Sequence, residues 1–276
     1  MIIGTKCFNM IVVLTLGFSK VVYAQGCTEP TMFMCDCSEP TLTLCRNRNF
    51  TQIPNLPADS IQLIFSQNKI SSIKDADFSG LLKLNILDLN NNEITRIENG
   101  AFSDIHTLGT LKLQHNKISS IEPDSFTGLP NLTGLDLSFN NLTTVKANMF
   151  DRVARLLLLL LNNNPLSCCT MGDFFEWKSN QTHLKVFRGT CHDFNTTTDI
   201  LSFDLSNCPV NGQWGSWSTG PCSVTCGQGI RYRNRRCDSP PASNNGQYCI
   251  GSSTDSLSCT LAGCRKSCKK SRKKAV

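Results

Sequence analysis

Five asparagines recur every 24 residues, and this spacing constrains the fold of the chain more than any other feature. They follow one another without a slip in register, at Asn68, Asn92, Asn116, Asn140 and Asn164. An apolar pair separated by one position precedes each of them at a fixed distance, in Leu63/Phe65, Leu87/Leu89, Leu111/Leu113, Leu135/Leu137 and Leu159/Leu161. A fixed period of this length is typical of stacked structural repeats and not of a globular domain.

Each repeat predicts a short strand followed by a turn. The alternating apolar pair points inward from the strand, and the Asn follows where the chain turns away. There its side-chain amide can hydrogen-bond backbone groups of the buried turn, which would otherwise lack partners. Phenylalanines with the same period are expected to stack into a spine in the outer half of each coil, at Phe78, Phe102, Phe126 and Phe150.

This pattern resembles the extracellular leucine-rich repeat, L-x-x-L-x-L-x-x-N-x-L, over residues 51–166. The resemblance implies an α/β solenoid of five repeats, a horseshoe with a parallel sheet on its concave side. Residues that flank the inward leucines are then expected to project from that side. They are Gln62, Ile64, Ser66, Ile86, Asp88, Asn90, Thr110, Lys112, Gln114, Gly134, Asp136, Ser138, Leu158, Leu160 and Asn162.

Four of these side chains are apolar, which is costly on a solvated face. Ile64, Ile86, Leu158 and Leu160 are therefore candidate contacts to a protein ligand. For the two leucines, packing under a C-terminal cap is an equally good interpretation. Asp88 and Asp136 are interpreted as ordinary solvated acids.

The chain has 16 cysteines, and none falls between Cys45 and Cys168. The groups on either side of the repeats resemble the amino- and carboxy-flanking caps of secreted leucine-rich repeat proteins, over residues 25–50 and 167–209. Such caps cover the apolar ends of a repeat stack. One departure is that Cys168 and Cys169 are adjacent, where the family has Cys-x-Cys. The resemblance implies the bridges Cys27–Cys37, Cys35–Cys45, Cys168–Cys191 and Cys169–Cys208.

A second module follows the caps. Trp214 and Trp217 form a W-x-x-W motif, and Cys222-Ser-Val-Thr-Cys226-Gly-Gln-Gly precedes alternating arginines that end at Cys237. This resembles a thrombospondin type-1 repeat over residues 210–264. The resemblance implies the bridges Cys222–Cys259, Cys226–Cys264 and Cys237–Cys249. The two tryptophans are expected to stack against Arg233 and Arg235, because a module this small and polar lacks an apolar core.

The first 24 residues read as a secretory signal peptide, with Lys6, an apolar run and small residues ending at Ala24. We therefore expect a secreted, soluble protein of the extracellular space or matrix, where disulfides persist. Five Asn-x-Ser/Thr sequons fit a glycosylated surface, at Asn49, Asn131, Asn141, Asn180 and Asn195. The thrombospondin resemblance adds C-mannosylation of Trp214 and O-fucosylation of Thr225.

The last segment, residues 265–276, carries seven Lys or Arg and no acid, while the whole chain has a net charge of only +6. The remainder is thus net acidic, and the tail is expected to be disordered. A polybasic arm favours sulfated glycosaminoglycans, although a solubilising end or a processing site is also consistent with it. The residues assigned to glycosaminoglycan binding are Arg231, Arg236, Arg265, Lys266, Lys269, Lys270, Arg272, Lys273 and Lys274. The unpaired Cys268 suggests either a disulfide-linked dimer or an idle thiol.

No motif of a catalytic or metal site accompanies the four histidines, so the sequence predicts neither an enzyme nor a cofactor. It predicts a recognition protein that binds an extracellular protein ligand or receptor and surface glycans, and no nucleic acid. Adhesion, guidance or signalling would use such an arrangement. Immune recognition of microbial surfaces and a structural matrix role are the alternatives.

Overall fold

The computed structural model describes residues 11–15, 18–22, 34–39, 41–75 and 77–263, which form two compact units divided between Leu205 and Ser206. Strands β1 (Ile11–Thr15) and β2 (Phe18–Val22) pair antiparallel within the segment expected to be a signal peptide. Cys27, Cys264, Cys268 and the basic tail lie outside the described residues. The secretory signal and the tail therefore stay predictions.

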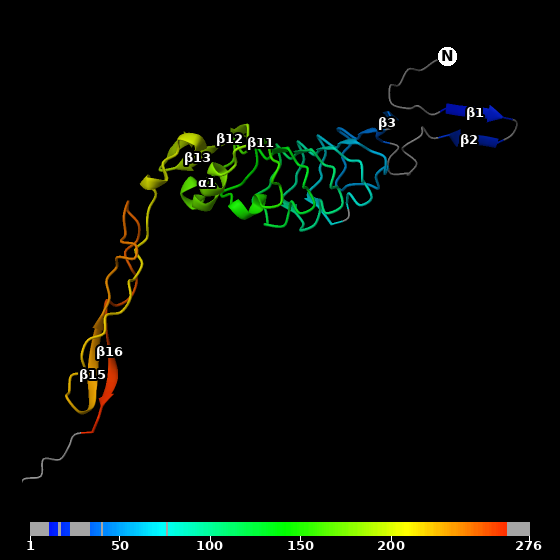
Figure 1. The fold of residues 1–276 in the computed structure, drawn as a ribbon. Helices are drawn as coiled ribbons and strands as arrows, with labels where there is room; N and C mark the ends of the chain where they lie inside the picture. Colours follow the sequence, from blue (N-terminus) through cyan, green and yellow to red (C-terminus); the bar gives the residue numbers. More distant parts are fainter. Residues whose placement is uncertain (1–10, 16–17, 23–33, 40, 76, 264–276) are drawn as a thin grey trace, which may run out of the picture. The chain divides into compact units, whose positions relative to one another are not determined.

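The first unit is built on an eight-stranded sheet that runs along one side of the repeats (Figure 1). Successive strands are parallel, except that β3 pairs antiparallel with β4, and the strands from β5 to β11 are each shifted by one 24-residue repeat. The strands are β3 (Asp36–Glu39), β4 (Leu42–Leu44), β5 (Gln62–Ile64), β7 (Ile86–Asp88), β9 (Thr110–Lys112), β10 (Gly134–Asp136), β11 (Leu158–Leu160) and β12 (Val186–Arg188). The solenoid with a parallel sheet is thus confirmed, and both flanking regions add strands to it.

The opposite side of the repeats consists of turns and short elements. Strands β6 (Ser72–Ile73) and β8 (Arg96–Ile97) pair there, and η2 (Ala147–Phe150) is a 3₁₀ turn. Among the described residues the one α-helix, α1 (Gly172–Ser179), lies after the last repeat. The C-terminal elements around it are η3 (Cys168–Thr170), β13 (Thr190–Asp193), β14 (Thr196–Asp199), η4 (Ile200–Ser202) and η5 (Leu205–Asn207).

The repeated asparagines form a hydrogen-bonded ladder through the interior. Asn116 donates from Nδ2 to the carbonyls of Leu89 and Leu113, each at 3.0 Å, and its Oδ1 accepts from the Ile94 amide at 3.0 Å. Asn92, Asn140 and Asn164 make equivalent bonds. Each side chain therefore joins its own repeat to the one before it.

At the N-terminal end the same side chain holds the cap. Asn68 donates to the Cys45 carbonyl at 2.8 Å, and its Oδ1 accepts from the amides of Arg48 and Phe50 at 2.9 and 3.1 Å. The first cap thus supplies the backbone groups that a preceding repeat would supply.

The phenylalanine spine forms in two parts. Phe102 stacks between Phe78 and Phe126, with ring centroids 5.9 and 6.4 Å apart. Phe150 packs against Phe174 of α1 at 5.9 Å, so the C-terminal cap continues the spine. All five rings are at most 1% exposed and contribute large apolar areas to the core.

The second unit has almost no apolar core. Strands β15 (Gly227–Asn234) and β16 (Thr254–Leu261) pair antiparallel along their whole length. Among the described residues of this unit, the buried hydrophobic side chains are Cys208 and Cys237 alone. Disulfides and stacked side chains must therefore stabilise it.

Asn116→Ala should destabilise the first unit by about 1–3 kcal/mol, because it leaves the buried Ile94 amide without a partner and removes one of the two side-chain donors to each of the Leu89 and Leu113 carbonyls. Denaturant unfolding followed by circular dichroism measures this change. Asn99→Ala, at an exposed position of the neighbouring turn, is the matched control and should be close to neutral. Equal midpoints for the two variants would contradict a structural role for the ladder.

Candidate binding surface

The outward side chains of the parallel strands form one continuous surface, here called the sheet face. The register aligns them in two rows, one from the first and one from the third residue of each strand. The first row is Leu42, Gln62, Ile86, Thr110, Gly134, Leu158 and Val186. The second row is Leu44, Ile64, Asp88, Lys112, Asp136, Leu160 and Arg188. The predicted concave residues therefore come together on this surface.

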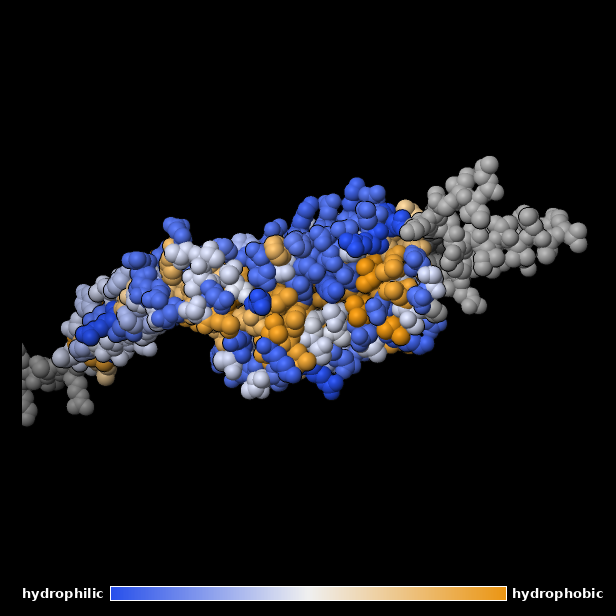
Figure 2. Space-filling model, turned by 90° about the horizontal axis from the view of Figure 1, so that it is seen from above, coloured by the Kyte–Doolittle hydropathy of each residue, from blue (hydrophilic) through white to orange (hydrophobic). Residues whose placement is uncertain are grey.

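Apolar side chains gather toward the two ends of the sheet face. Leu42, Leu44, Ile64 and Ile86 make an N-terminal apolar group, and all four are half-buried. Leu158, Leu160 and Val186 make a C-terminal apolar group, in which the leucines are half-buried and Val186 is 39% exposed. Figure 2 shows orange areas toward both ends of the repeats, with paler and blue atoms between them. Neither group is fully covered by its cap.

The centre of the sheet face is polar, and here one sequence interpretation was wrong. Asp88 is not a solvated acid, since it is only 7% exposed. Its Oδ1 accepts from the amide and the side chain of Asn90 at 3.1 and 2.5 Å, and Lys112 Nζ lies 3.6 Å from its Oδ2. Neighbouring strands only ~4.8 Å apart leave water little access to a short side chain held in this way. Asp136 is half-buried.

Two serines expected on the binding surface are buried as well. Ser66 is 5% and Ser138 4% exposed, and Ser138 donates from Oγ to Asp136 Oδ1 at 2.6 Å. Because both side chains are buried, they offer little to a ligand. The other predicted residues of the centre remain accessible at least in part, and they are Gln62, Asn90, Thr110, Lys112, Gln114, Gly134 and Asn162.

An aromatic pair beside this centre was missed from the sequence. His115 and Phe139 occupy equivalent positions in adjacent repeats, and their rings stack with centroids 4.1 Å apart. Phe139 is 43% exposed. Both residues have positive φ, as do Gln67, Asn91 and Asn163 in the same column. The 24-residue period places 115 beside 139 and was the available signal.

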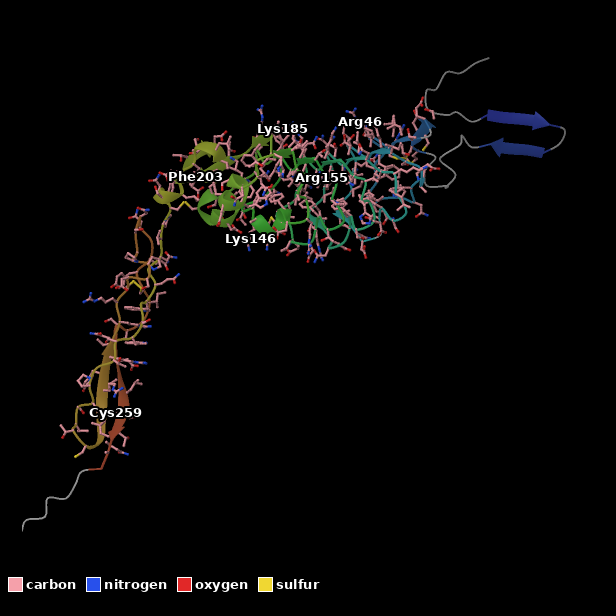
Figure 3. All side chains as sticks on the ribbon, viewed as in Figure 1. Arg46, Lys146, Arg155, Lys185, Phe203 and Cys259 are labelled. Carbon is pink, nitrogen blue, oxygen red and sulfur yellow. A yellow bond between two sulfur atoms is a disulfide. The ribbon has the colours of Figure 1, made fainter. Side chains whose placement is uncertain are left out.

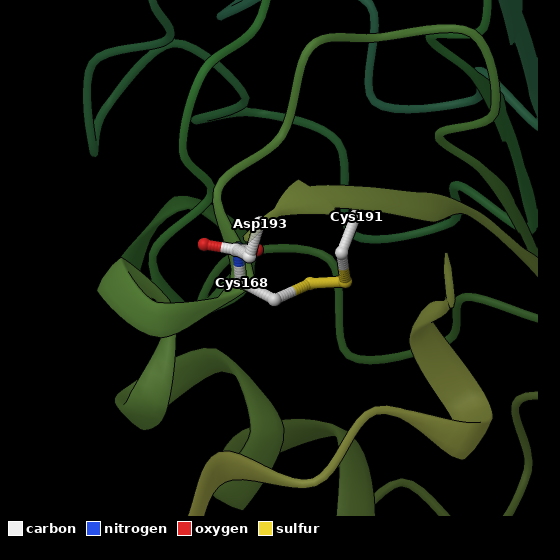
Figure 4. A group of neighbouring side chains, drawn as sticks. All are labelled: Cys168, Cys191 and Asp193. Carbon is white, nitrogen blue, oxygen red and sulfur yellow. A yellow bond between two sulfur atoms is a disulfide. The ribbon is translucent and has the colours of Figure 1, made fainter. Parts of the chain in front are cut away.

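The C-terminal cap is locked by a disulfide and a carboxylate. Cys168 and Cys191 are bridged, and Asp193 accepts from the Cys168 amide at 2.7 Å and from Ser167 Oγ at 2.8 Å (Figure 4). The two sulfurs and the carboxylate lie close enough to hold a metal ion. Thiols joined in a disulfide offer no thiolate ligands, so the arrangement is structural.

The structure contains three more of the implied bridges, Cys35–Cys45, Cys222–Cys259 and Cys237–Cys249. Cys259 is labelled on β16 in Figure 3. Cys37, Cys169, Cys208 and Cys226 are also disulfide-bonded. The pairings Cys27–Cys37 and Cys226–Cys264 involve residues outside the described ranges, and Cys169–Cys208 stays a prediction.

All five sequon asparagines are exposed. Asn131 differs from the others in being held at both ends of its amide. It donates to the His106 carbonyl at 2.9 Å and accepts from Arg155 Nη1 at 3.0 Å (Figure 3 labels Arg155). In the second unit Thr225 is exposed and Trp214 is half-buried. Their modification stays a prediction.

The second unit is organised by the expected stack of tryptophans and arginines. The Arg235 guanidinium lies 4.3 Å from the Trp214 ring centre and 4.4 Å from that of Trp217, and Arg233 covers Trp217 at 4.4 Å. The four side chains thus alternate ring and guanidinium, held by cation–π attraction. Trp214 also donates from Nε1 to the Ile250 carbonyl at 2.8 Å.

The stack ends at Arg233, which is paired with an acid. Asp255, opposite it on β16, accepts from Arg233 Nη2 at 2.6 Å. The hydrogen bonds that Asp255 accepts from Arg233 hold the pKa of its carboxyl below its usual range. Arg231 lies opposite Leu257 instead, and no tryptophan stacks on it among the described residues. A Cβ at Gly220 would lie 2.4 Å from the Tyr232 carbonyl oxygen, so a side chain does not fit there.

Of the residues assigned to glycosaminoglycan binding, the structure describes two. Arg236 is exposed, and Arg231 is half-buried with its Nε atom enclosed. Arg265, Lys266, Lys269, Lys270, Arg272, Lys273 and Lys274 lie outside the described residues.

Comparison with known families agrees with this architecture. A model of the leucine-rich repeat matches residues 62–118 and 106–166, and a model of the thrombospondin type 1 domain matches residues 212–264. This chain contains leucine-rich repeats followed by a thrombospondin type 1 domain.

Several curated proteins are similar to a short stretch of this chain. Thrombospondin-1 of Xenopus laevis is 48% identical over 58 residues, which are 21% of this chain and 5% of that protein. Properdin of Cavia porcellus is 46% identical over 59 residues, 21% of this chain and 13% of properdin. SCO-spondin of Gallus gallus is 40% identical over 77 residues, 28% of this chain and 1% of that protein. The chain thus spans only a small part of the length of each.

The repeats resemble a solved structure. In the TLR13–ssRNA13 complex, one chain matches 55% of this chain with a TM-score of 0.51 and 26% identity, and the match covers 22% of that chain. Within the described residues, no helix is both long and apolar enough to cross a membrane.

Asp255→Asn should lower the melting temperature of the second unit at pH 7. Because folding lowers the pKa of Asp255, its contribution to stability is present above the ordinary carboxyl pKa and is lost as pH falls through the lowered value. The difference between variant and parent should therefore shrink in acid, as measured by calorimetry. Asp238→Asn, at an exposed acid of the same unit, should leave the melting temperature unchanged at both pH values.

Proposed function

We propose that this chain is a secreted, non-enzymatic recognition protein that binds a protein ligand through its sheet face. The combination of leucine-rich repeats with a thrombospondin type 1 domain is typical of extracellular adhesion and recognition proteins. The observation that carries the proposal is the arrangement of the sheet face, where two apolar groups flank a polar centre.

The apolar groups favour a protein over a small ligand. Seven aliphatic side chains on one face are only half-buried or exposed, at both ends of a surface seven strands wide. Apolar side chains that stay accessible in this way mark surfaces that a protein partner covers. Polar side chains between them would then set specificity, because a mismatched partner leaves their hydrogen bonds unmade.

We further propose that the second unit and the basic tail hold the protein on sulfated glycosaminoglycans. Seven basic residues among the last twelve attract any dense anion without needing a shaped pocket. Exposed Arg236 and half-buried Arg231, which lies beyond the end of the stack, add positive charge on the second unit. The protein ligand would then meet a solenoid that is already anchored.

Leu158→Lys combined with Leu160→Lys should abolish capture of the protein ligand while leaving secretion intact. Charged side chains would place unpaired ammonium groups in the interface, which is strongly unfavourable. Capture from native tissue with the secreted glycoprotein, quantified by mass spectrometry, measures the effect. Leu82→Lys, at a residue that is 68% exposed away from the strands, is the matched control and should bind normally.

Secretion separates the two interpretations of these leucines. Intracellular retention of the double variant would mean that the leucines are core residues, and the binding role of the C-terminal apolar group would be wrong. A secreted double variant that captures the same proteins as the parent would contradict the proposal directly.

Removing the tail should lower the salt concentration at which the protein elutes from heparin. A version ending at Cys264 lacks seven positive charges, and salt screens such attraction strongly, with the Debye length falling from ~10 Å at 0.1 M to ~3 Å at 1 M. Equal elution of the two versions would exclude the tail from glycosaminoglycan binding. A secreted form that already ends before the tail would favour the processing site.

A further inference from the structure

Two cations lie beside the C-terminal apolar group, which consists of Leu158, Leu160 and Val186. The register places Leu158 next to Val186 and Leu160 next to Arg188. Lys185 directly precedes Val186 and lies on the side of the molecule that carries the strands (Figure 3). Lys185, Val186 and Arg188 are all exposed, so this corner of the sheet face is open to a partner.

Neither cation is neutralised within the described part of the chain. Among those residues, Lys185 and Arg188 take part in no ion pair. The nearest acid of the second row is Asp136 on β10, and β11 lies between it and Arg188. At two strand spacings, about 10 Å, the field of this acid is largely screened at physiological salt. The two positive charges are therefore available to a partner.

The outward side chains of β11 and β12 form a grid of two strands by two positions. Neighbouring strands are ~4.8 Å apart, and successive outward residues of one strand are ~7 Å apart. Three corners of the grid are the aliphatic residues, and the fourth is Arg188. An extended ligand has the same ~7 Å spacing between side chains on one face. An aliphatic residue that packs on Val186 therefore brings the ligand residue two positions away to Arg188.

From these observations we propose that the C-terminal end of the sheet face binds an acidic segment of the protein ligand, in which one residue separates an aliphatic side chain from a carboxylate. The aliphatic side chain packs on Leu158 and Val186, and the carboxylate pairs with Arg188. A second acid on the other side of the aliphatic residue pairs with Lys185. This inference rests on the proposed function, because it names the chemistry of the partner that the same surface recognises.

An acidic polypeptide fits this corner better than other ligands do. A purely apolar ligand would cover Arg188 and remove it from water without giving it a partner, which is costly. A sulfated glycan would match the two cations, but its polar rings would bring no apolar surface to the three aliphatic side chains. A carboxylate can accept two parallel hydrogen bonds from the guanidinium, so an acid beside an aliphatic residue satisfies both parts of the surface.

Panning a library of random peptides on the secreted full-length protein tests the inference. Selected peptides should be enriched in an aliphatic residue that is one residue away from Asp or Glu. Lys185→Glu combined with Arg188→Glu should weaken these peptides at least about tenfold, because like charges would then face each other in the complex. Replacing the acid of the peptide by lysine should reverse the preference, so that the altered peptide binds the charge-reversed variant better than the parent. Arg188→Gln, which only removes a charge, should weaken the original peptides by a smaller factor.

A matched variant controls for the net charge of the molecule. Lys146→Glu with Arg152→Glu makes the same change of charge at two exposed cations that take part in no ion pair among the described residues. Figure 3 labels Lys146 on the side opposite the strands. This variant should bind the peptides as the parent does. Val186→Asn, a neutral change at a residue that is 39% exposed, should weaken the peptides without changing the salt dependence of binding.

The outcomes distinguish this inference from the proposed function. Peptides without acids that lose binding on Val186→Asn but not on the charge reversal would overturn the acidic ligand and leave the sheet face as the binding surface. Acidic peptides that bind the charge-reversed variant and the matched control equally well are held elsewhere, for example by the basic tail, and would overturn it too. If no selected peptide depends on any residue of the sheet face, both proposals are wrong.

Discussion

The fold depends on how the backbone of each turn is satisfied inside the repeat stack. The chain leaves the sheet through an apolar interior, where amides and carbonyls cannot reach water. An asparagine side chain carries both a donor and an acceptor on a short stem, so one residue serves three backbone groups at once. Leucine at this position would fill the same space, but it would leave the Ile94 amide unpaired and each of the two carbonyls with one donor fewer. The 24-residue spacing of the asparagines and the hydrogen bonds that each turn needs thus express the same constraint.

Because the interior is fixed by inward residues, the outward residues are free to differ from repeat to repeat. Ile86, Thr110, Gly134 and Leu158 hold equivalent positions in successive strands and share no chemical property. The sheet face therefore joins variable chemistry to a rigid scaffold. The caps complete it by adding β4 and β12, which carry Leu42, Leu44 and Val186 onto the same surface.

The repeats, the sheet and the stack of the second unit were predictable, since each depends on residues that recur or match a specific motif. The burial and the hydrogen bonds of individual outward residues were not predictable. Asp88 looked like a solvated acid because its burial arises from Asn90 and from Lys112 of the next strand. Asp193, which holds the C-terminal cap, carries no local signal, since its partners Ser167 and Cys168 lie 25 or more residues away. The strands added by the caps were equally hidden, because they lack the repeated pattern.

The residues directly before the repeated asparagines have a left-handed backbone conformation, and this limits which side chains the edge of the binding surface can carry. Residues 67, 91, 115, 139 and 163 have φ between 52° and 58°. This conformation costs free energy for any residue with a Cβ, and the cost is highest for β-branched residues. Valine, isoleucine and threonine are therefore poor candidates at these positions, whereas glycine would relax the backbone but leave no side chain to bind with. Phe139 gains an exposed ring at a conformational cost. The residue types that can vary at this edge are therefore few, and they are mainly asparagine, glutamine and aromatic residues that are not β-branched.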